Sequence, residues 1–309
     1  MSETTFEAIT TKSELLAAAR GHGLELRAEQ EGLDEMGLDF RVLHARDADG
    51  AQWFVRTARR PGGGEVARRE AAVLRLVAPR LPVAVPEWTV AAADVIAHRR
   101  IAGTPAITIE GGAVTWNGIR PDRPLPGAFL DSLAEALGAL LAIPQEEARD
   151  AGVRVRDIWA TRAEIARAID LAQSVLPLPD PLRARWQRWL DGDGWPPELA
   201  LTHGDLHAGH MLLDGDARLV GVLDWTEARV TDPSIDLAFV VGTFGRPVLD
   251  ELMARIARHG VVLPPSLADH TEARWSVTPA MIAAWAIEHD HEAALEHARA
   301  MLYDHASTM

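Results

Sequence analysis

The spacing of apolar residues changes along the chain, and this change limits the folds that are open to it. Residues 40–58 alternate between apolar and polar positions and contain Asp49-Gly50, a dipeptide that tolerates the positive φ angles of a tight hairpin. Residues 85–101 are also extended in character. Helical spacing in this part is predicted for residues 12–20 and 62–78. The first hundred residues should therefore form a small sheet that carries one prominent helix.

After a Gly-, Pro- and Thr-rich connector at residues 103–127, which is expected to be rich in loops, the helical period dominates. One extended island is expected at residues 199–224. Helices are predicted at or near residues 129–144, 159–175, 182–191, 246–259, 266–275 and 279–304. Strands gathered in one part and helices in the other predict an α+β chain with two lobes, which we divide into residues 1–101 and 102–309.

Charge and composition narrow the classes of function. The chain has 31 basic and 45 acidic residues, a net charge of −14, so nucleic acid and anionic membranes are poor partners and a cationic small molecule is a better one. The absence of cysteine excludes disulfides, Fe–S clusters and thiolate zinc sites. The sequence contains no secretory leader pattern and no run of about 18 apolar residues, so we expect a cytoplasmic protein. Lys12 is the only lysine, so an active-site lysine is not expected.

Residues 201–214, LTHGDLHAGHMLLD, concentrate histidine and carboxylate side chains. One interpretation is a zinc site of a hydrolase formed by His203, Asp205, His207 and His210, since imidazole and carboxylate groups suit zinc. However, successive residues of a strand face opposite sides, so His203 and Asp205 can share a side, whereas the positions of His207 and His210 depend on an unknown loop path.

A second interpretation uses a longer stretch of sequence. An aspartate on a loop at 205, a candidate metal ligand five residues later at 210, and a further aspartate at 224 after an apolar strand match the spacing of a kinase catalytic loop and its metal-binding aspartate. Phosphoryl transfer needs a carboxylate that orients the attacking hydroxyl and other groups that hold Mg²⁺ against the phosphates. The ordered set therefore favours a kinase.

The segments HGDLHAGH (203–210), VLDWTEA (222–228) and DPSIDLA (232–238) resemble the aminoglycoside phosphotransferase family of antibiotic kinases. Within that family, a histidine at position 210 and the run from Trp225 to Arg229 resemble the macrolide 2′-phosphotransferase group. The resemblance extends over residues 12–300. It implies a protein-kinase-like bilobal fold and transfer of the γ-phosphate of GTP, or alternatively of ATP, with Mg²⁺, to the 2′-hydroxyl of the desosamine sugar of macrolides.

The resemblance also implies roles for matching residues. Asp205 would orient the hydroxyl as the catalytic base, and His210 and Asp224 would hold the metal. The nucleotide would be bound by Arg56 and its partner Glu70, by Gly37 and Asp39 in the phosphate loop, and by His98, Arg99 and Ile101 at the hinge. Arg56 stands where the family has lysine, His210 stands where relatives have asparagine, and the phosphate loop lacks G-x-G-x-x-G. Since Mg²⁺ prefers oxygen ligands, we expect Mn²⁺ to substitute at least in part.

A macrolide is a large apolar ring with one dimethylammonium sugar, so its site should be a wide apolar cleft with few carboxylates. The candidates for this site are Glu227, Glu272, Trp275, Met281, Ile282 and Trp285. The four apolar candidates have helical spacing, and such a stripe belongs to a core more often than to a pocket.

Several of these residues also have purely structural interpretations. His203 fits a hydrogen-bonding residue of the loop, His207 an exposed loop residue, and Arg56 an ordinary strand cation. Asp232 and Asp236 fit acceptors that stabilise a loop. The rival functions are a kinase of aminoglycosides or other alcohols, a nucleotide-binding pseudokinase and the zinc hydrolase. The protein is expected to be a monomer.

Overall fold

The computed structural model describes residues 8–34, 40–110, 113–196 and 198–307. The chain divides into two compact units, which are described separately below. Unit 1 comprises Met1–Ile119, Asp150–Val153 and Ala208–Ala228, and unit 2 comprises Arg120–Arg149, Arg154–His207 and Arg229–Met309. The segment 208–228 thus belongs to the unit formed by the N-terminal part of the chain. The division into lobes after residue 101 stays a prediction.

Unit 1 contains the predicted hairpin, which is part of a five-stranded antiparallel sheet with strand order β1-β2-β3-β5-β4. Its strands are β1 (Arg27–Ala28), β2 (Phe40–Arg46), β3 (Gln52–Ala58), β4 (Trp88–Ala91) and β5 (Ile96–Arg99). Asp47 closes the turn between β2 and β3, because its carboxylate accepts the N–H groups of Asp49 and Ala51. Gly50 in this turn has a φ of 85°, as the sequence predicted.

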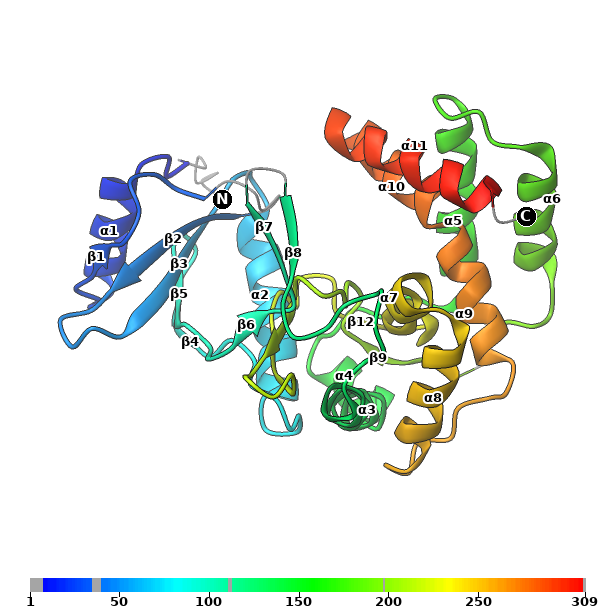
Figure 1. The fold of residues 1–309 in the computed structure, drawn as a ribbon. Helices are drawn as coiled ribbons and strands as arrows, with labels where there is room; N and C mark the ends of the chain where they lie inside the picture. The colour runs from blue at the N-terminus through cyan, green and yellow to red at the C-terminus, as the bar shows by residue number, and fades with distance from the viewer. Residues whose placement is uncertain (1–7, 35–39, 111–112, 197, 308–309) are drawn as a thin grey trace. The chain divides into compact units, whose positions relative to one another are not determined.

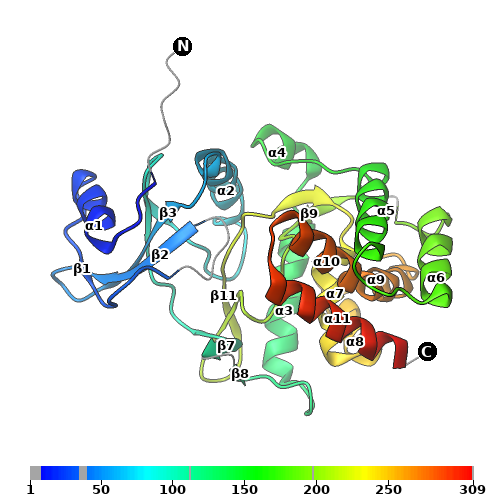
Figure 2. The same ribbon diagram turned by 90° about the horizontal axis from the view of Figure 1, so that it is seen from above.

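Two helices cover opposite faces of this sheet: α1 (Lys12–Gly21) and α2 (Gly63–Val77) (Figures 1 and 2). Strand side chains alternate between the faces, so Leu43 and Val55 pack with α1, whereas Phe40 and Ala58 pack with α2. A Cβ on Gly63 would lie 2.4 Å from the Cβ of Ala58, so the close approach of α2 to β3 requires glycine there. Arg56 alternates in register with Ala58 and therefore lies on the α2 face.

The connector at 103–127 contains more regular structure than expected. It forms β6 (Thr104–Pro105) and the hairpin of β7 (Ile107–Glu110) and β8 (Ala113–Trp116). The expectation of a loop-rich segment is wrong here, because β-branched residues such as Thr108 and Thr115 pair across the hairpin. β6 pairs with β10 (Met211–Leu213), which in turn pairs with β11 (Leu219–Val222).

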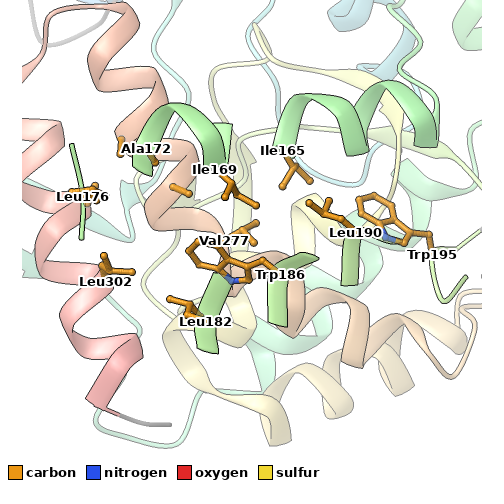
Figure 3. Close-up of a cluster of buried hydrophobic side chains, with 13 residues drawn as sticks. Ile165, Ile169, Ala172, Leu176, Leu182, Trp186, Leu190, Trp195, Val277 and Leu302 are labelled. Carbon is orange, nitrogen blue, oxygen red and sulfur yellow. The ribbon is translucent and has the colours of Figure 1, made fainter. Parts of the chain in front are cut away.

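Unit 2 is mainly helical, as predicted. Its helices are α3 (Gly127–Leu141), α4 (Gln145–Asp150), α5 (Ile158–Gln173), α6 (Asp180–Asp191), α7 (Ser234–Phe244), α8 (Arg246–Ala257), α9 (Leu267–Ser276), α10 (Thr278–Glu288) and α11 (Glu292–Ser307), and β9 (Ala200–Thr202) pairs with β12 (Arg229–Thr231). The single helix expected at 279–304 is wrong, because Asp290 has a φ of 53° and separates α10 from α11. One core cluster joins α5, α6, α10, α11 and Val277 between α9 and α10 around the buried indoles of Trp186 and Trp195 (Figure 3). Among the described residues, no helix combines the length and apolar character needed to cross a membrane.

Candidate active site

The β10–β11 hairpin of unit 1 positions the two predicted metal ligands. Met211 pairs with Val222, so the next residues, His210 and Leu223, lie opposite each other. The N–H of Leu223 donates to the carbonyl of His210 over 2.9 Å. As a result, Nε2 of His210 lies 3.8 Å from Oδ2 of Asp224. The two side chains are therefore neighbours because of strand register, although they lie 14 positions apart in sequence.

Asp224 has an unusual backbone conformation. Its φ is 58°, which is uncommon for a residue other than glycine, and such conformations gather at functional sites. Both the Oγ1 and the N–H of Thr226 donate to Oδ1 of Asp224, over 2.6 and 3.3 Å. Burial opposes ionisation of Asp224, but the charge of His210, the Thr226 hydrogen bonds and the charge of Arg56 outweigh it and lower its pKa. The side chain is 47% exposed, so an ionised carboxylate is accessible to a cation.

Arg56 and Glu70 form a bidentate ion pair on the α2 face of the sheet. Nη1 and Nη2 of Arg56 donate to Oε1 and Oε2 of Glu70 over 3.1 and 2.9 Å. The guanidinium also lies 4.3 Å from the centre of the Phe40 ring. Glu70 is fully buried, which raises its pKa, while the charge and hydrogen bonds of Arg56 act in the opposite direction. A buried carboxylate of this kind requires a paired cation.

The His210–Asp224 pair and the Arg56–Glu70 pair belong to one electrostatic cluster in unit 1. The N–H of Trp225, next to Asp224, donates to the Glu70 carboxylate, and the charge of Asp224 raises the pKa of Glu70. Arg56 in turn lowers the pKa of Asp224. The guanidinium therefore stabilises two carboxylates that would otherwise repel each other.

Unit 2 contains the loop that carries the proposed catalytic base. Thr202 at the end of β9 pairs with Arg229 of β12, so the residues after β9 lie near the start of α7. There Asp236 accepts the N–H groups of His203 and Gly204 over 2.7 and 2.8 Å. Gly204 has a φ of 86°, a conformation that glycine adopts readily. The next residue, Asp205, has a side chain that is 54% exposed, as a base that meets a substrate requires.

Asp232 anchors a second buried network in unit 2. Its carboxylate accepts the Oγ–H and N–H of Ser234, Nε2–H of His270 at 2.8 Å and Nη1 of Arg274 at 3.1 Å. Nδ1 of His270 accepts the indole N–H of Trp189, which fixes the proton of the neutral ring on Nε2. Burial opposes ionisation of Asp232, but the hydrogen bond from His270 and the charge of Arg274 lower its pKa to about 2.

The two aspartates of the DPSID segment differ in pKa. Burial raises the pKa of Asp236 to about 6, and the two loop N–H groups that it accepts offset only part of this effect. The interpretation of Asp232 and Asp236 as loop-stabilising acceptors is confirmed. His203 is fully buried and its Nδ1 accepts the N–H of Asp205 at 3.3 Å, which favours its structural interpretation over zinc binding. His207 is partly exposed, with Nε2 3.9 Å from Oδ2 of Asp205.

The predicted nucleotide contacts lie in unit 1. His98 is buried, which lowers its pKa to about 4, and its Nδ1 lies 2.9 Å from the carbonyl of Arg99. The neutral ring therefore donates to that carbonyl. Arg99 is exposed and lies against the Trp53 ring, and Ile101 is partly buried. Gly37 and Asp39 lie outside the described residues.

The six acceptor-side candidates do not share one environment. Glu227, in unit 1, is exposed, and Glu272, in unit 2, pairs with Arg246 at 2.8 Å. Met281 and Ile282 pack against the core cluster of Figure 3, Trp285 stacks on His289, and Trp275 lies against Gly242 of α7. Packing of the two aliphatic residues into the core agrees with the core interpretation of the stripe. A drug-binding role for these six residues stays a prediction.

Sequence reasoning missed two polar partners of the site. Thr226 fixes one oxygen of Asp224, and the N–H of Trp225 binds Glu70. The run Asp224-Trp225-Thr226 indicated the contact with Thr226, because the side chain of an aspartate often accepts a hydrogen bond from the residue two positions later. The second is a backbone contact between segments 155 residues apart, and no side-chain pattern encodes it.

Comparison with known proteins found related sequences and solved structures. The sequence profile described as the phosphotransferase enzyme family matches residues 33–276. The uncharacterized protein YcbJ of Bacillus subtilis (strain 168) is 32% identical over 283 residues, which cover 91% of this chain and 92% of YcbJ. Among solved structures, macrolide 2′-phosphotransferase type I superposes with a TM-score of 0.84 at 36% identity, covering 96% of this chain and 99% of the other. Macrolide 2′-phosphotransferase MphH from Brachybacterium faecium, as apoenzyme, gives 0.81 at 33% identity, with 94% and 98% covered.

Proposed function

Since the chain belongs to the phosphotransferase enzyme family, we propose that it is an antibiotic kinase that transfers the γ-phosphate of GTP to the 2′-hydroxyl of the desosamine sugar of macrolides. The observation that carries the proposal is the cluster of Arg56, Glu70, His210 and Asp224 in unit 1. It combines a fixed cation with an accessible carboxylate, which are the groups that a metal-bound triphosphate needs. The choice of a macrolide is supported by the two macrolide 2′-phosphotransferases that resemble this chain over nearly its whole length.

The residues around Asp224 fit a divalent cation. The carboxylate is ionised, half-exposed and held by Thr226, and the imidazole of His210 lies beside it. Asp224 and His210 would hold Mg²⁺, which would neutralise phosphate charge when bound. Because an imidazole is a less favourable ligand for Mg²⁺ than an amide oxygen, we propose that Mn²⁺ also supports activity.

In the proposed mechanism, the residues of unit 1 hold the nucleotide and Asp205 of unit 2 acts on the acceptor. Arg56, oriented by Glu70, binds phosphate oxygens, and backbone groups at Arg99 and Ile101 bind the base. The Asp205 carboxylate accepts a hydrogen bond from the 2′-hydroxyl and takes its proton as the oxygen attacks the γ-phosphate. The same negative charge attracts the neighbouring dimethylammonium group of the sugar. The bond between the γ-phosphorus and the β–γ bridging oxygen breaks, GDP leaves, and the drug is phosphorylated and inactive. We propose that the enzyme works as a cytoplasmic monomer.

The test is incubation of the purified protein with erythromycin, GTP and Mg²⁺, followed by mass spectrometry of the drug. We expect one added phosphoryl group on the desosamine, faster with GTP than with ATP. The Asp205→Ala variant should lose about two to four orders of magnitude in kcat while its Kd for GTP stays close to that of the wild type. Kanamycin in parallel reactions distinguishes an aminoglycoside kinase. Unmodified erythromycin in the presence of tightly bound nucleotide would instead indicate the pseudokinase.

A further inference from the structure

A cavity of about 720 Å³ lies in unit 1, and none of Arg56, Glu70, His210 and Asp224 lines it. One wall is α2, whose positions 64, 67, 68, 71 and 75 follow one face of the helix. The other wall is β4, the edge strand of the sheet, with Ala92 and Ala93 after it. The hollow exists because glycine and alanine occupy most of these positions. Its volume falls within the usual range of small-molecule sites, about 300–1,000 Å³.

The polar groups of this cavity are mainly positive. Arg68 and Arg75 line it, and among the described residues neither has a carboxylate within ion-pair distance. The acidic lining residue, Glu65, already pairs with Arg69 at 3.2 Å. Gly62 begins α2 without a capping side chain, and the start of a helix favours anions. An anion in this cavity would thus meet two uncompensated guanidinium groups, although the chain as a whole has a charge of −14.

Trp88 is part of the same wall. The residue lines the cavity, and its indole nitrogen is buried without a hydrogen-bond partner among the described residues. A buried donor without an acceptor costs about 1–3 kcal/mol, so such groups call for an explanation. The pairing of β4 with β5 shifts register between Trp88 and Val90. The two side chains therefore lie on opposite faces of the sheet, with Trp88 on the α2 face and Val90 on the α1 face. Trp88 packs against the cluster of Phe40, Ala58, Ala67 and Ile96, so the cavity adjoins the residues on which Arg56 rests.

We propose that this cavity is a second ligand site, which takes a small organic anion with a flat apolar body, of the aromatic carboxylate or sulfonate class. The alanine-rich walls and the Trp88 side chain would bury the body, and Arg68 and Arg75 would bind the anionic group. A macrolide is excluded as the occupant, because its ammonium group would face two arginines. The proposal therefore does not depend on the proposed function.

The probe for the test is 8-anilinonaphthalene-1-sulfonate, an aromatic sulfonate whose fluorescence increases in an apolar site. The titration uses the full chain with saturating GTP and Mg²⁺, and is repeated for Arg68→Ala, Arg75→Ala and Ala71→Trp, the last of which fills the cavity. Arg27→Ala is the matched control, since it removes an exposed arginine from β1 of the same unit. In parallel, the indole N–H signal of Trp88 is followed by NMR and assigned with Trp88→Phe.

Loss of either arginine should weaken the affinity for the probe up to about fivefold, as expected for one exposed ion pair. Ala71→Trp should weaken it more than about tenfold, Arg27→Ala should leave it unchanged, and the Trp88 indole signal should shift on binding. The proposal is overturned if Arg27→Ala and the two cavity arginine variants behave alike, or if the Trp88 signal stays fixed while the probe binds. Circular dichroism identifies a misfolded Ala71→Trp variant. In that case the proposal is tested by the probe affinities of the arginine variants and by the Trp88 indole signal.

Discussion

Asp236→Asn tests how the loop of Asp205 is held. The wild-type carboxylate uses one oxygen for the N–H of Gly204 and the other for the N–H of His203. An asparagine offers only one acceptor oxygen, and its NH₂ group would face the second N–H, so one buried donor loses its partner. Misplacement of a catalytic group by about 1 Å can cost a hundredfold in rate. We therefore expect kcat for drug phosphorylation to fall about tenfold to a hundredfold, with the Kd for GTP close to that of the wild type.

The same substitution has a pH signature. The folded-state pKa of Asp236 is about 6, above the ordinary value of 3.8, so the native state binds this proton more tightly than the unfolded state. The stability gained is complete below the unfolded pKa and is lost as the pH rises through about 6. At pH 5 this proton stabilises the wild-type native state by about 1 kcal/mol, and at pH 8 it contributes nothing. Asparagine cannot bind the proton, so the destabilisation caused by Asp236→Asn should be about 1 kcal/mol larger at pH 5 than at pH 8.

The assay is urea unfolding of both proteins at pH 5 and pH 8, together with steady-state kinetics. Asp170→Asn, an exposed aspartate of α5, is the control, and its effect on stability should be equal at the two pH values. A destabilisation by Asp236→Asn that is the same at both pH values, or larger at pH 8, would refute the burial argument. An unchanged kcat would refute the role of Asp236 in positioning the loop.

Three further predictions follow from the geometry. Asp224→Ala should abolish the Mg²⁺-dependent part of GTP binding measured by calorimetry, and an unchanged affinity would contradict its role as a ligand. Arg56→Lys removes the guanidinium group that donates to both carboxylate oxygens of the buried Glu70. Thermal unfolding should therefore occur at a lower temperature, and the KM for GTP should rise. Gly242→Ala should destabilise the fold by at least about 1–3 kcal/mol in urea unfolding, because the new Cβ would lie 1.9 Å from the Trp275 ring. The control is Gly64→Ala, whose new Cβ would have no neighbouring atom within 4 Å, so this change should be neutral or stabilising.

The predicted α+β, protein-kinase-like bilobal fold is confirmed, and much of its secondary structure was encoded locally. The β2–β3 hairpin and α2 have clear periods of 2 and 3.6, and glycine or proline marks their limits. α7 was not predicted, because the sequence SIDLAFVVGTF is apolar on most sides and has no helical period. The hairpin of β7 and β8 was hidden by the Gly, Pro and Thr content of its surroundings.

For the candidate site, sequence spacing proposed residues but did not predict their environments. Asp232 and Asp236 are four positions apart, and both are buried, yet Arg274 and His270 hold the pKa of one at about 2 while burial raises that of the other to about 6. The difference arises from α9, whose residues lie more than thirty positions downstream. A motif specifies which groups are present, whereas their charges depend on partners that only the tertiary fold supplies.

Arginine at position 56 illustrates how a departure from the family pattern can be explained by its surroundings. A lysine at this position would offer a point charge to a carboxylate that is fully buried and has two oxygens to satisfy. The planar guanidinium satisfies both oxygens and also rests on the ring of Phe40, which a smaller ammonium group would fill less completely. Together with the larger effects of the His210 charge and the Thr226 hydrogen bond, the charge of Arg56 also lowers the pKa of Asp224. Arg56 therefore contributes both to the hydrogen bonding of the buried Glu70 carboxylate and to the lowered pKa of Asp224.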